Sequence, residues 1–346
     1  MGYSHSAILT EDNQLHTFGS NGKGQLGHND QESLIEPKII NYFQKNNLKV
    51  VDVNLGQEFS MALTSDGDVW TWGFGGRNWN FLMKLFANST GPLGHGDVLQ
   101  RHTPTPVEYL RKFDPITDIA CGYKFCNAVN GKKELYNWGI GEYGVFGHGG
   151  NSSYSLPILN DYFEHWQKTE GMEIQKIKSA NQYSMALMSD GKLYGWGCNE
   201  FGQMGIKNEI GVEIYETANY PIAINTEEFA PHAKIVDFAV GENIVGILFD
   251  NNEVYWSGKK IAYRPEKMQL PSSAGKIKLI GACHHSVVVV DENNKIYFVG
   301  DYMKAKESND RTGVSMADNE SFGGGNILSI GGTYQNKFAI VDNSRN

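Results

Sequence analysis

Glycines spaced as in phosphate-binding loops are the first residues in this sequence that could do chemistry. The stretch LYGWGCNEFGQMGI at 193–206 places Gly197, Gly202 and Gly205 five and then three residues apart. Loops of this kind hold a phosphate on their backbone amides when a strand precedes them and a helix follows. No helical pattern follows Gly205. We therefore interpret this stretch as a structural turn.

The same glycine spacing returns at LHTFGSNGKGQLGH (15–28) and LYNWGIGEYGVFGH (135–148). A motif that returns along the chain is a repeat and not an isolated site. An aromatic residue before the first glycine suits packing between sheets. We expect Gln25 and Gln203 to tie the turn backbone by hydrogen bonds. We also expect three tryptophans to be buried at matching places in successive repeats: Trp72, Trp138 and Trp196.

The histidines are the other candidates for chemistry. We assign His5 and His284 to a repeat position that holds Phe59, Phe125 or Tyr183 in other copies. They are therefore interpreted as packing residues, and the same interpretation applies to the histidines after the glycine turns, His28, His95 and His148. The sequence shows no nucleophile elbow, paired carboxylates or metal-ligand cluster. We predict a protein that is not an enzyme and has no catalytic residue, cofactor or metal.

The cysteines and the overall charge limit the class of protein. Four cysteines in 346 residues make no disulfide framework, and we expect buried free thiols in a reducing compartment. An intracellular location follows, with the cytoplasm favoured and a mitochondrial, ciliary or cytoskeletal assembly left open. The net charge of -9 argues against a nucleic-acid partner. No apolar run is long enough to span a membrane.

Hairpins precede the glycine turns. FSMALTSDGDVWTWG (59–73) and YSMALMSDGKLYGWG (183–197) each join two strand-like runs through a turn rich in Asp and Gly. A further strand ends in glycine upstream, as in ITDIACG (116–122). Successive copies begin 40 to 66 residues apart, which is room for about four short strands. Four-stranded sheets repeated in this way indicate a β-propeller.

The repeat resembles that of the regulator of chromosome condensation family. The segments that carry the resemblance are GYSHSAIL (2–9), FGSNGKGQLGH (18–28), TSDGDVWTWG (64–73) and MSDGKLYGWGCNEFGQMG (188–205). The resemblance implies an all-β fold, with residues 1–346 forming a single RCC1-like β-propeller domain that usually has seven blades. Two copies depart from the pattern, with 259–271 and the polar loop 301–325 replacing the glycine turn. The last copy stops after KFAIVD (337–342). We expect seven blades with one incomplete, and six is the alternative.

An insertion in the second copy is the main candidate for a binding site. Gly73 and Gly91 are eighteen residues apart, so about thirteen residues are added within 77–90. Apolar side chains recur there at the spacing of one helix face. Two interpretations stay open: the insertion caps its own blade, or it docks into another protein. The candidate partner-binding residues are Arg77, Trp79, Phe81, Leu82 and Phe86.

These observations favour a non-catalytic scaffold that binds other proteins within a larger assembly. The alternative, which the family resemblance implies, is a guanine-nucleotide exchange factor or regulator for a small GTPase. Light sensing, known for a plant member with repeated Gly-Trp-Arg-His, is not favoured. The residue after the corresponding glycine is never tryptophan here; the six residues at this position are Tyr3, Gln57, Tyr123, Asn181, Glu242 and Ala282.

Overall fold

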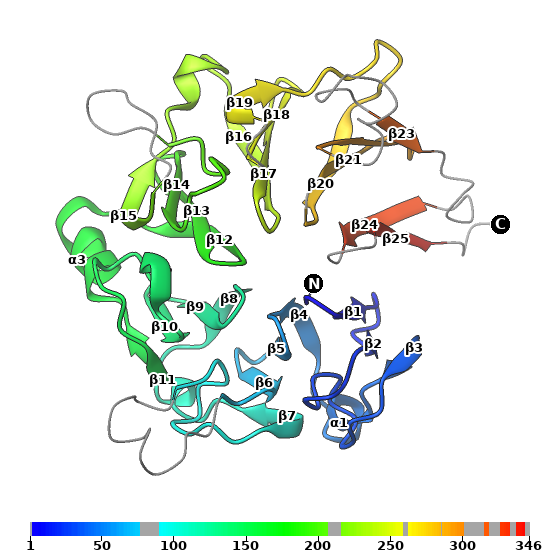
Figure 1. Ribbon diagram of the computed structural model, residues 1–346, viewed down its shortest axis with the longest axis vertical. Helices are drawn as coiled ribbons and strands as arrows, with labels where there is room; N and C mark the ends of the chain where they lie inside the picture. Colours follow the sequence, from blue (N-terminus) through cyan, green and yellow to red (C-terminus); the bar gives the residue numbers. More distant parts are fainter. Residues whose placement is uncertain are drawn as a thin grey trace. The chain divides into compact units, whose positions relative to one another are not determined.

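The structure is a computed structural model that describes residues 2–76, 90–206, 216–258, 262–284, 286–300, 315–317, 326–332 and 337–342. The chain divides into two compact units. Unit 1 is Met1–Asp190 with Trp196–Cys198, and unit 2 is Gly191–Gly195 with Asn199–Asn346. The division falls within one sheet, and each unit is built from antiparallel sheets that follow one another in chain order (Figure 1).

Four sheets, here called blades one to four, contain the strands β1 to β15. Blade one is β1 (His5–Leu9), β2 (Leu15–Gly19) and β3 (Leu34–Ile39). Blade two is β4 (Val50–Leu55), β5 (Phe59–Thr64), β6 (Val69–Gly73) and β7 (Arg101–Pro106). Blade three is β8 (Ile116–Cys121), β9 (Phe125–Asn130), β10 (Leu135–Gly139) and β11 (Tyr154–Leu159). Blade four is β12 (Ile174–Ala180), β13 (Tyr183–Met188), β14 (Leu193–Gly197) and β15 (Ala218–Ala223).

Three further sheets lie in unit 2. Blade five is β16 (Ile235–Val240), β17 (Ile244–Phe249), β18 (Val254–Gly258) and β19 (Ala262–Lys267). Blade six is β20 (Ile277–Ala282), β21 (Val287–Asp291), β22 (Ile296–Val299) and β23 (Ser315–Ala317), and blade seven is β24 (Asn326–Gly332) with β25 (Lys337–Asp342). The described helices are short: α1 (Asn41–Lys45), η1 (Leu110–Lys112), η2 (Glu142–Gly144), α3 (Asp161–Glu170) and η3 (Thr226–Glu228).

The sheets confirm an all-β fold, but two copies, and not just the one expected, have fewer than four described strands. In the described residues, blade one has three strands and blade seven has two, whereas the other five have four. Two segments predicted to replace the glycine turn contain outer strands instead. β19 lies within 259–271, and β23 lies within the predicted polar loop 301–325. In both copies an outer strand therefore forms although the sequence lacks the repeated glycine motif before it.

Apolar side chains of neighbouring blades pack into common cores. One core joins Met61 and Leu63 of β5 to Ile119 of β8 and to Tyr136 and Trp138 of β10. A core of the same kind joins blades five and six in unit 2. One four-stranded sheet cannot bury both of its faces, so each blade depends on its neighbour for burial.

The predicted tryptophans make the main repeated contact between blades in unit 1. Trp72, Trp138 and Trp196 are all fully buried, as expected. The indole Nε1 of each donates a hydrogen bond to a carbonyl in the glycine turn of the preceding blade. The accepting oxygens are those of Gln25 at 2.9 Å, Pro92 at 2.8 Å and Val145 at 2.9 Å. We call this arrangement the tryptophan contact.

The third glycine of each turn makes room for the tryptophan ring. Gly27, Gly94 and Gly147 have φ values of 80°, 80° and 70°, a region that glycine adopts without strain. A Cβ atom at any of the three would lie 2.9 Å from an atom of the indole ring. The glycine spacing therefore serves blade packing. The predicted role of the glutamines is also confirmed, since Gln25 and Gln203 accept from the backbone amides of Lys23 and Phe201.

Proline occupies the fourth position of the outer strand in blades one to five. Proline has no N–H to donate, so it is tolerated at the edge of a sheet and interrupts further strand pairing there. The constant position of this proline is a sequence signal for the outer strand, in addition to the glycine pattern. The five residues are Pro37, Pro104, Pro157, Pro221 and Pro265.

Candidate functional site

The candidate residues in the insertion, Arg77, Trp79, Phe81, Leu82 and Phe86, lie outside the described residues. The two flanks of the insertion are described, and they meet. A Cβ atom on Gly91 would lie 1.6 Å from the carbonyl oxygen of Gly75. The two ends of the insertion therefore lie together on blade two.

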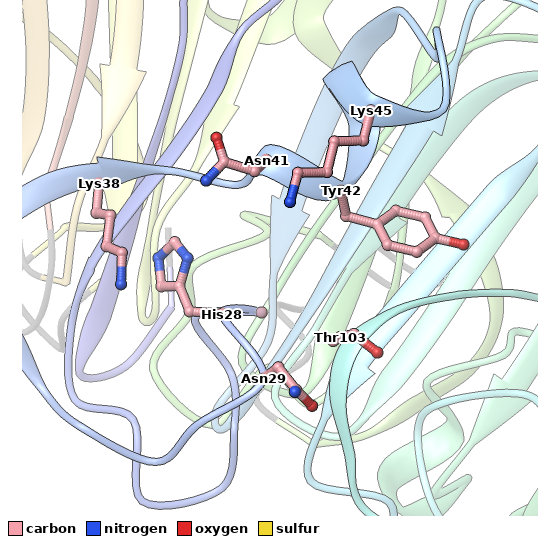
Figure 2. A pocket seen from close by; sticks show the side chains of 8 residues that line it. His28, Asn29, Lys38, Asn41, Tyr42, Lys45 and Thr103 are labelled. Atoms are coloured by element: carbon pink, nitrogen blue, oxygen red, sulfur yellow. The ribbon is translucent and has the colours of Figure 1, made fainter.

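A pocket of about 270 Å³ lies in unit 1, where blade one meets blade two (Figure 2). The turn after β2 and strand β3 form one side of it, helix α1 forms a second, and β7 contributes one residue. The lining residues are Gly27, His28, Asn29, Lys38, Asn41, Tyr42, Lys45 and Thr103. Because Thr103 comes from another blade, the packing of the two blades creates the pocket.

Helix α1 is held in place by aromatic packing beneath it. Phe43 is buried, and its ring centroid lies 6.0 Å from those of Trp70 and Trp72. The ring of Tyr42 contacts Trp70 at 5.6 Å. These contacts fix the backbone from which Lys45 extends. Lys38 is placed by the β2–β3 register, in which it pairs with Thr17.

His28 is oriented by the Thr17 hydroxyl. That hydroxyl donates to the carbonyl oxygen of Leu26 at 2.7 Å, so it accepts from Nε2 of His28 at 3.1 Å. The neutral ring therefore carries its proton on Nε2. Burial lowers the pKa of His28, the positive charge of Lys38 lowers it further, and Asp30 opposes the shift. The ring is therefore mostly neutral at pH 7.

Two lysines give the pocket its charge. Lys38 and Lys45 are exposed, and neither forms an ion pair with any residue in the described part of the chain. The lining contains no carboxylate. The whole protein is acidic, with 39 Asp and Glu against 30 Lys and Arg. The pocket is thus a locally cationic site. No local sequence pattern indicates it, because its residues converge only through blade packing.

The predicted packing role of the histidines holds for His5. His5 is buried, and its Nε2 lies 3.0 Å from the Ser60 hydroxyl. Gly2 lies against the His5 ring as Gly56 lies against Phe59 and Gly122 against Phe125. Burial lowers the pKa of His5 to about 3.

His95 repeats the arrangement of His28 in the next blade. Its Nε2 lies 2.9 Å from the Thr71 hydroxyl, which donates to the Leu93 carbonyl. Burial and the charge of Arg101 lower the pKa of His95 to about 4.

The assignment of His284 to the same position as His5 is wrong. The turn of blade six closes by a bond from the Cys283 amide to the Ser286 carbonyl, as the Gly56 amide bonds the Phe59 carbonyl in blade two. Cys283 therefore takes the place of the glycine, and Ser286 takes the place of His5. His284 is instead the first residue after the glycine position, which Cys283 occupies. Its Nδ1 lies against the Glu242 carboxylate.

The four cysteines are free and buried. Cys121 and Cys126 face each other across β8 and β9 with their sulfurs 3.7 Å apart, and burial raises the pKa of Cys126. Within the described residues, no group of three or more His, Cys, Asp or Glu side chains is placed to hold a metal ion. The helices described also include none with the length and apolar character needed to cross a membrane.

Comparisons with protein families identify the repeat. A family model described as the regulator of chromosome condensation (RCC1) repeat matches residues 12–63, 87–129 and 190–248. A second model of the same description matches 50–78 and 174–203. Together the two models cover more than half of the chain.

Curated relatives match in sequence over part of their length. The Arabidopsis thaliana ultraviolet-B receptor UVR8 is 33% identical over 212 residues, which is 60% of this chain and 42% of that protein. A Danio rerio RCC2 homolog is 24% identical over 310 residues, covering 85% of this chain and 58% of the relative. The human E3 ubiquitin-protein ligase HERC2 matches over 59% of this chain but only 4% of its own length. The chain thus spans less than two thirds of each of these relatives.

Solved structures show the same fold. Prp20p of Saccharomyces cerevisiae superposes with a TM-score of 0.74 at 21% identity, covering 98% of this chain and 80% of Prp20p. Human WBSCR16 gives a TM-score of 0.71 at 17% identity, covering 95% of this chain and 82% of that chain. The predicted all-β propeller is confirmed, and the chain belongs to the RCC1 repeat family.

Proposed function

We propose that this protein is a non-catalytic scaffold that binds other proteins, as a subunit or accessory protein of a larger assembly. The observation that carries the proposal is the meeting of Gly75 and Gly91 at the base of the insertion. Because the two flanks already touch, blade two can close without the residues between them. Those residues include several large apolar side chains, which are costly to leave in water at about 25 cal/mol per Å² of apolar surface. The blade can close without this apolar segment. The segment is therefore suited to binding a partner.

Proteins of the same fold supply independent support. Prp20p was studied for its binding to Gsp1p and histones, and yeast RCC1 was solved bound to Kap60. Propellers of this kind therefore present surfaces to other proteins. For the present chain, the partner and the surface it uses are part of the proposal.

The test removes the insertion without breaking the blade. One variant replaces 77–89 with a short Gly-Ser linker, and a second keeps the length but changes Trp79, Phe81, Leu82 and Phe86 to serine. We expect both to keep the wild-type melting temperature and to lose specific partners in affinity purification. A fall in melting temperature with partners retained would show that the insertion only caps its own blade.

The alternative function is nucleotide exchange on a small GTPase, or its regulation. It rests on the family resemblance. Release of a fluorescent nucleotide from a panel of small GTPases separates the two functions. The scaffold proposal expects no acceleration of release, and acceleration of one GTPase in proportion to the protein concentration would favour the alternative.

We also propose an intracellular, reducing compartment, with the cytoplasm favoured over a mitochondrial, ciliary or cytoskeletal assembly. The support is the set of four buried free cysteines. Imaging of a tagged full-length chain, with cell fractionation as a second measurement, tests the location.

A further inference from the structure

We propose that the cationic pocket between blades one and two binds a phosphate monoester group, with Lys38 and Lys45 supplying the positive charge. This inference does not depend on the scaffold function. It starts from the composition of the lining, which has two lysines and no carboxylate in a protein of net charge -9. A lysine ammonium is a common binder of phosphate groups as a point charge.

The lysines reach the pocket from two different elements. Lys38 extends from β3 and Lys45 from α1, and in the view of Figure 2 the His28 ring lies between their side chains. The anchoring of α1 by Phe43 limits how far Lys45 can move away. Two cations held on opposite sides of one hollow repel each other when it is empty. A dianion between them removes that repulsion.

The remaining lining supplies neutral hydrogen-bond donors. Asn29 and Thr103 lie on the lower side of the hollow in Figure 2, and Asn41 lies on α1 above it. Their amide and hydroxyl groups can donate to further oxygens of a bound anion. The Thr103 hydroxyl comes from blade two, so an anion in the pocket would contact both blades.

Asp30 is the acidic group whose charge acts on His28, and it has hydrogen-bond partners outside the pocket. Its Oδ1 accepts from the Asn21 side-chain amide at 2.8 Å and from the Glu32 backbone amide at 3.1 Å. Asp30 is not among the lining residues. Within the described residues Asp30 forms no ion pair with Lys38 or Lys45, so both ammonium groups are available to a ligand.

The size and charge of the pocket favour a phosphate over a carboxylate or a larger molecule. A carboxylate has one charge and two oxygens, so it would leave one lysine unmatched. A phosphate monoester has close to two charges and three free oxygens. The volume of about 270 Å³ lies just below the range of about 300–1,000 Å³ that is typical for drug-sized ligands. A small anionic group fits this description.

The test measures binding of inorganic phosphate to the full chain by calorimetry and by NMR titration. We expect saturable binding that Lys38→Gln and Lys45→Gln each weaken by about tenfold, the value of one charge-assisted hydrogen bond. Lys49→Gln is the matched control, because it removes the same charge from an exposed lysine that does not line the pocket. We expect the control to stay within about twofold of wild type, as remote surface charges are screened.

A second set of probes identifies the source of the phosphate. A phosphoserine peptide, its unphosphorylated form and a nucleoside monophosphate are titrated against wild type and the double lysine variant. Lysine-dependent binding of the phosphopeptide tighter than that of phosphate would assign the group to a partner protein. Tighter binding of the nucleotide would assign it to a small molecule.

Two results would overturn the inference. One is the absence of saturable phosphate binding to the wild-type chain. The other is equal binding by wild type and by the double lysine variant, with both shown to be folded by circular dichroism. Because both lysines are exposed, we expect the variants to fold.

Discussion

The glycine turns of blades one to three each receive a tryptophan from the next blade, whereas the turn of blade four receives a serine. Ser257 of β18 donates its hydroxyl to the Gln203 carbonyl at 2.7 Å. The strand register places Ser257 where β6 has Trp72, since both residues precede the glycine that pairs with the start of the second strand. The turn carbonyl accepts a hydrogen bond in both cases, but the donor is an indole in one case and a small hydroxyl side chain in the other.

The comparison separates two roles that the tryptophan combines. The role found in all four turns is hydrogen-bond donation to the turn carbonyl. The volume of the indole is supplied differently in blade five, where Pro265 would contact a Cβ on Gly205 at 2.9 Å. Trp256 is buried one residue earlier in the strand, on the opposite face from Ser257. Donation is thus the constant requirement, and the filling of space is variable.

The largest effect should come from removing an indole ring. We expect Trp138→Ala to lower the free energy of unfolding by about 3–5 kcal/mol, because it opens a cavity and leaves the Pro92 carbonyl without this donor. Trp138→Phe should cost less, because it refills part of the space. Urea unfolding measures both, with Trp166→Ala on the half-buried face of α3 as the control. A cost for Trp138→Ala no greater than the control's would contradict the role of the tryptophan contact.

The first tryptophan contact has an added sensitivity to acid. The Ser60 hydroxyl donates to the same Gln25 carbonyl as Trp72, and it accepts from His5. The pKa of His5 is lowered from 6.5 to about 3, so the unfolded chain takes up the proton first as the pH falls. Stability from His5 is complete above about pH 6.5 and is lost between there and pH 3. By pH 4.5 the loss should be about 3 kcal/mol.

The matching variant is His5→Phe, which installs the residue that Phe59 and Phe125 supply in the next two blades. Thermal melts of the variant and the wild type from pH 7 to pH 4.5 measure the difference. We expect the variant to lose stability less steeply as the pH falls, although it lacks the Ser60 bond. Parallel curves would show that His5 does not set the acid sensitivity.

Substitution of the third glycine should cause a smaller loss of stability. A comparison of two glycines separates the cost of contact with the tryptophan ring from the cost of backbone strain. Gly147 and Gly171 have similar φ values, 70° and 65°, but only a Cβ on Gly147 would meet another group, the Trp196 ring. Gly171→Ala should cost about 1 kcal/mol from the left-handed backbone alone. Gly147→Ala should cost about 2 kcal/mol more through overpacking. Equal costs, measured by urea unfolding, would mean that the glycine serves only the turn.

The smallest loss of stability should come from removing the Ser257 hydroxyl. Ser257→Ala removes one hydrogen bond and little volume, so we expect a loss of about 1 kcal/mol. Ser272→Ala, in the exposed loop before β20, is the control and should be close to neutral. If Ser257→Ala is as neutral as the control, donation to the turn carbonyl is not the constant requirement.

The repeat itself was readable from the sequence, and so were its consequences for burial. The aromatic–glycine spacing predicted the burial of Trp72, Trp138 and Trp196, and the turn glutamines were assigned correctly. These features depend on contacts within one repeat or on a side chain too large to leave exposed. The local sequence pattern is therefore sufficient to predict them.

The errors came from positions where a different residue fills a repeated role. In blade six Gly281 suggested a turn two residues too early, because Cys283 occupies the position that glycine holds elsewhere. The hydrogen bond from Ser257 has no sequence signal, because tryptophan makes it in the earlier blades and serine replaces that ring here. The cationic pocket joins residues as distant as Lys38 and Thr103, and no local pattern connects them. The insertion residues stay a prediction.

The turn carbonyl and the donor that satisfies it lie on different copies of the repeat, and this has a consequence for how such a chain can grow. Blades two to four each carry an acceptor for the copy that follows and a donor for the copy that precedes, as in blade two with Pro92 and Trp72. A whole copy gained or lost by duplication or deletion of its coding segment leaves every junction with one donor and one acceptor. Gain or loss of only part of a copy leaves a junction with an unpaired donor or an unpaired acceptor. Changes in the number of repeats should therefore survive selection in whole units, and insertions within a copy should be tolerated where the flanking glycines already meet, as Gly75 and Gly91 do beside 77–90.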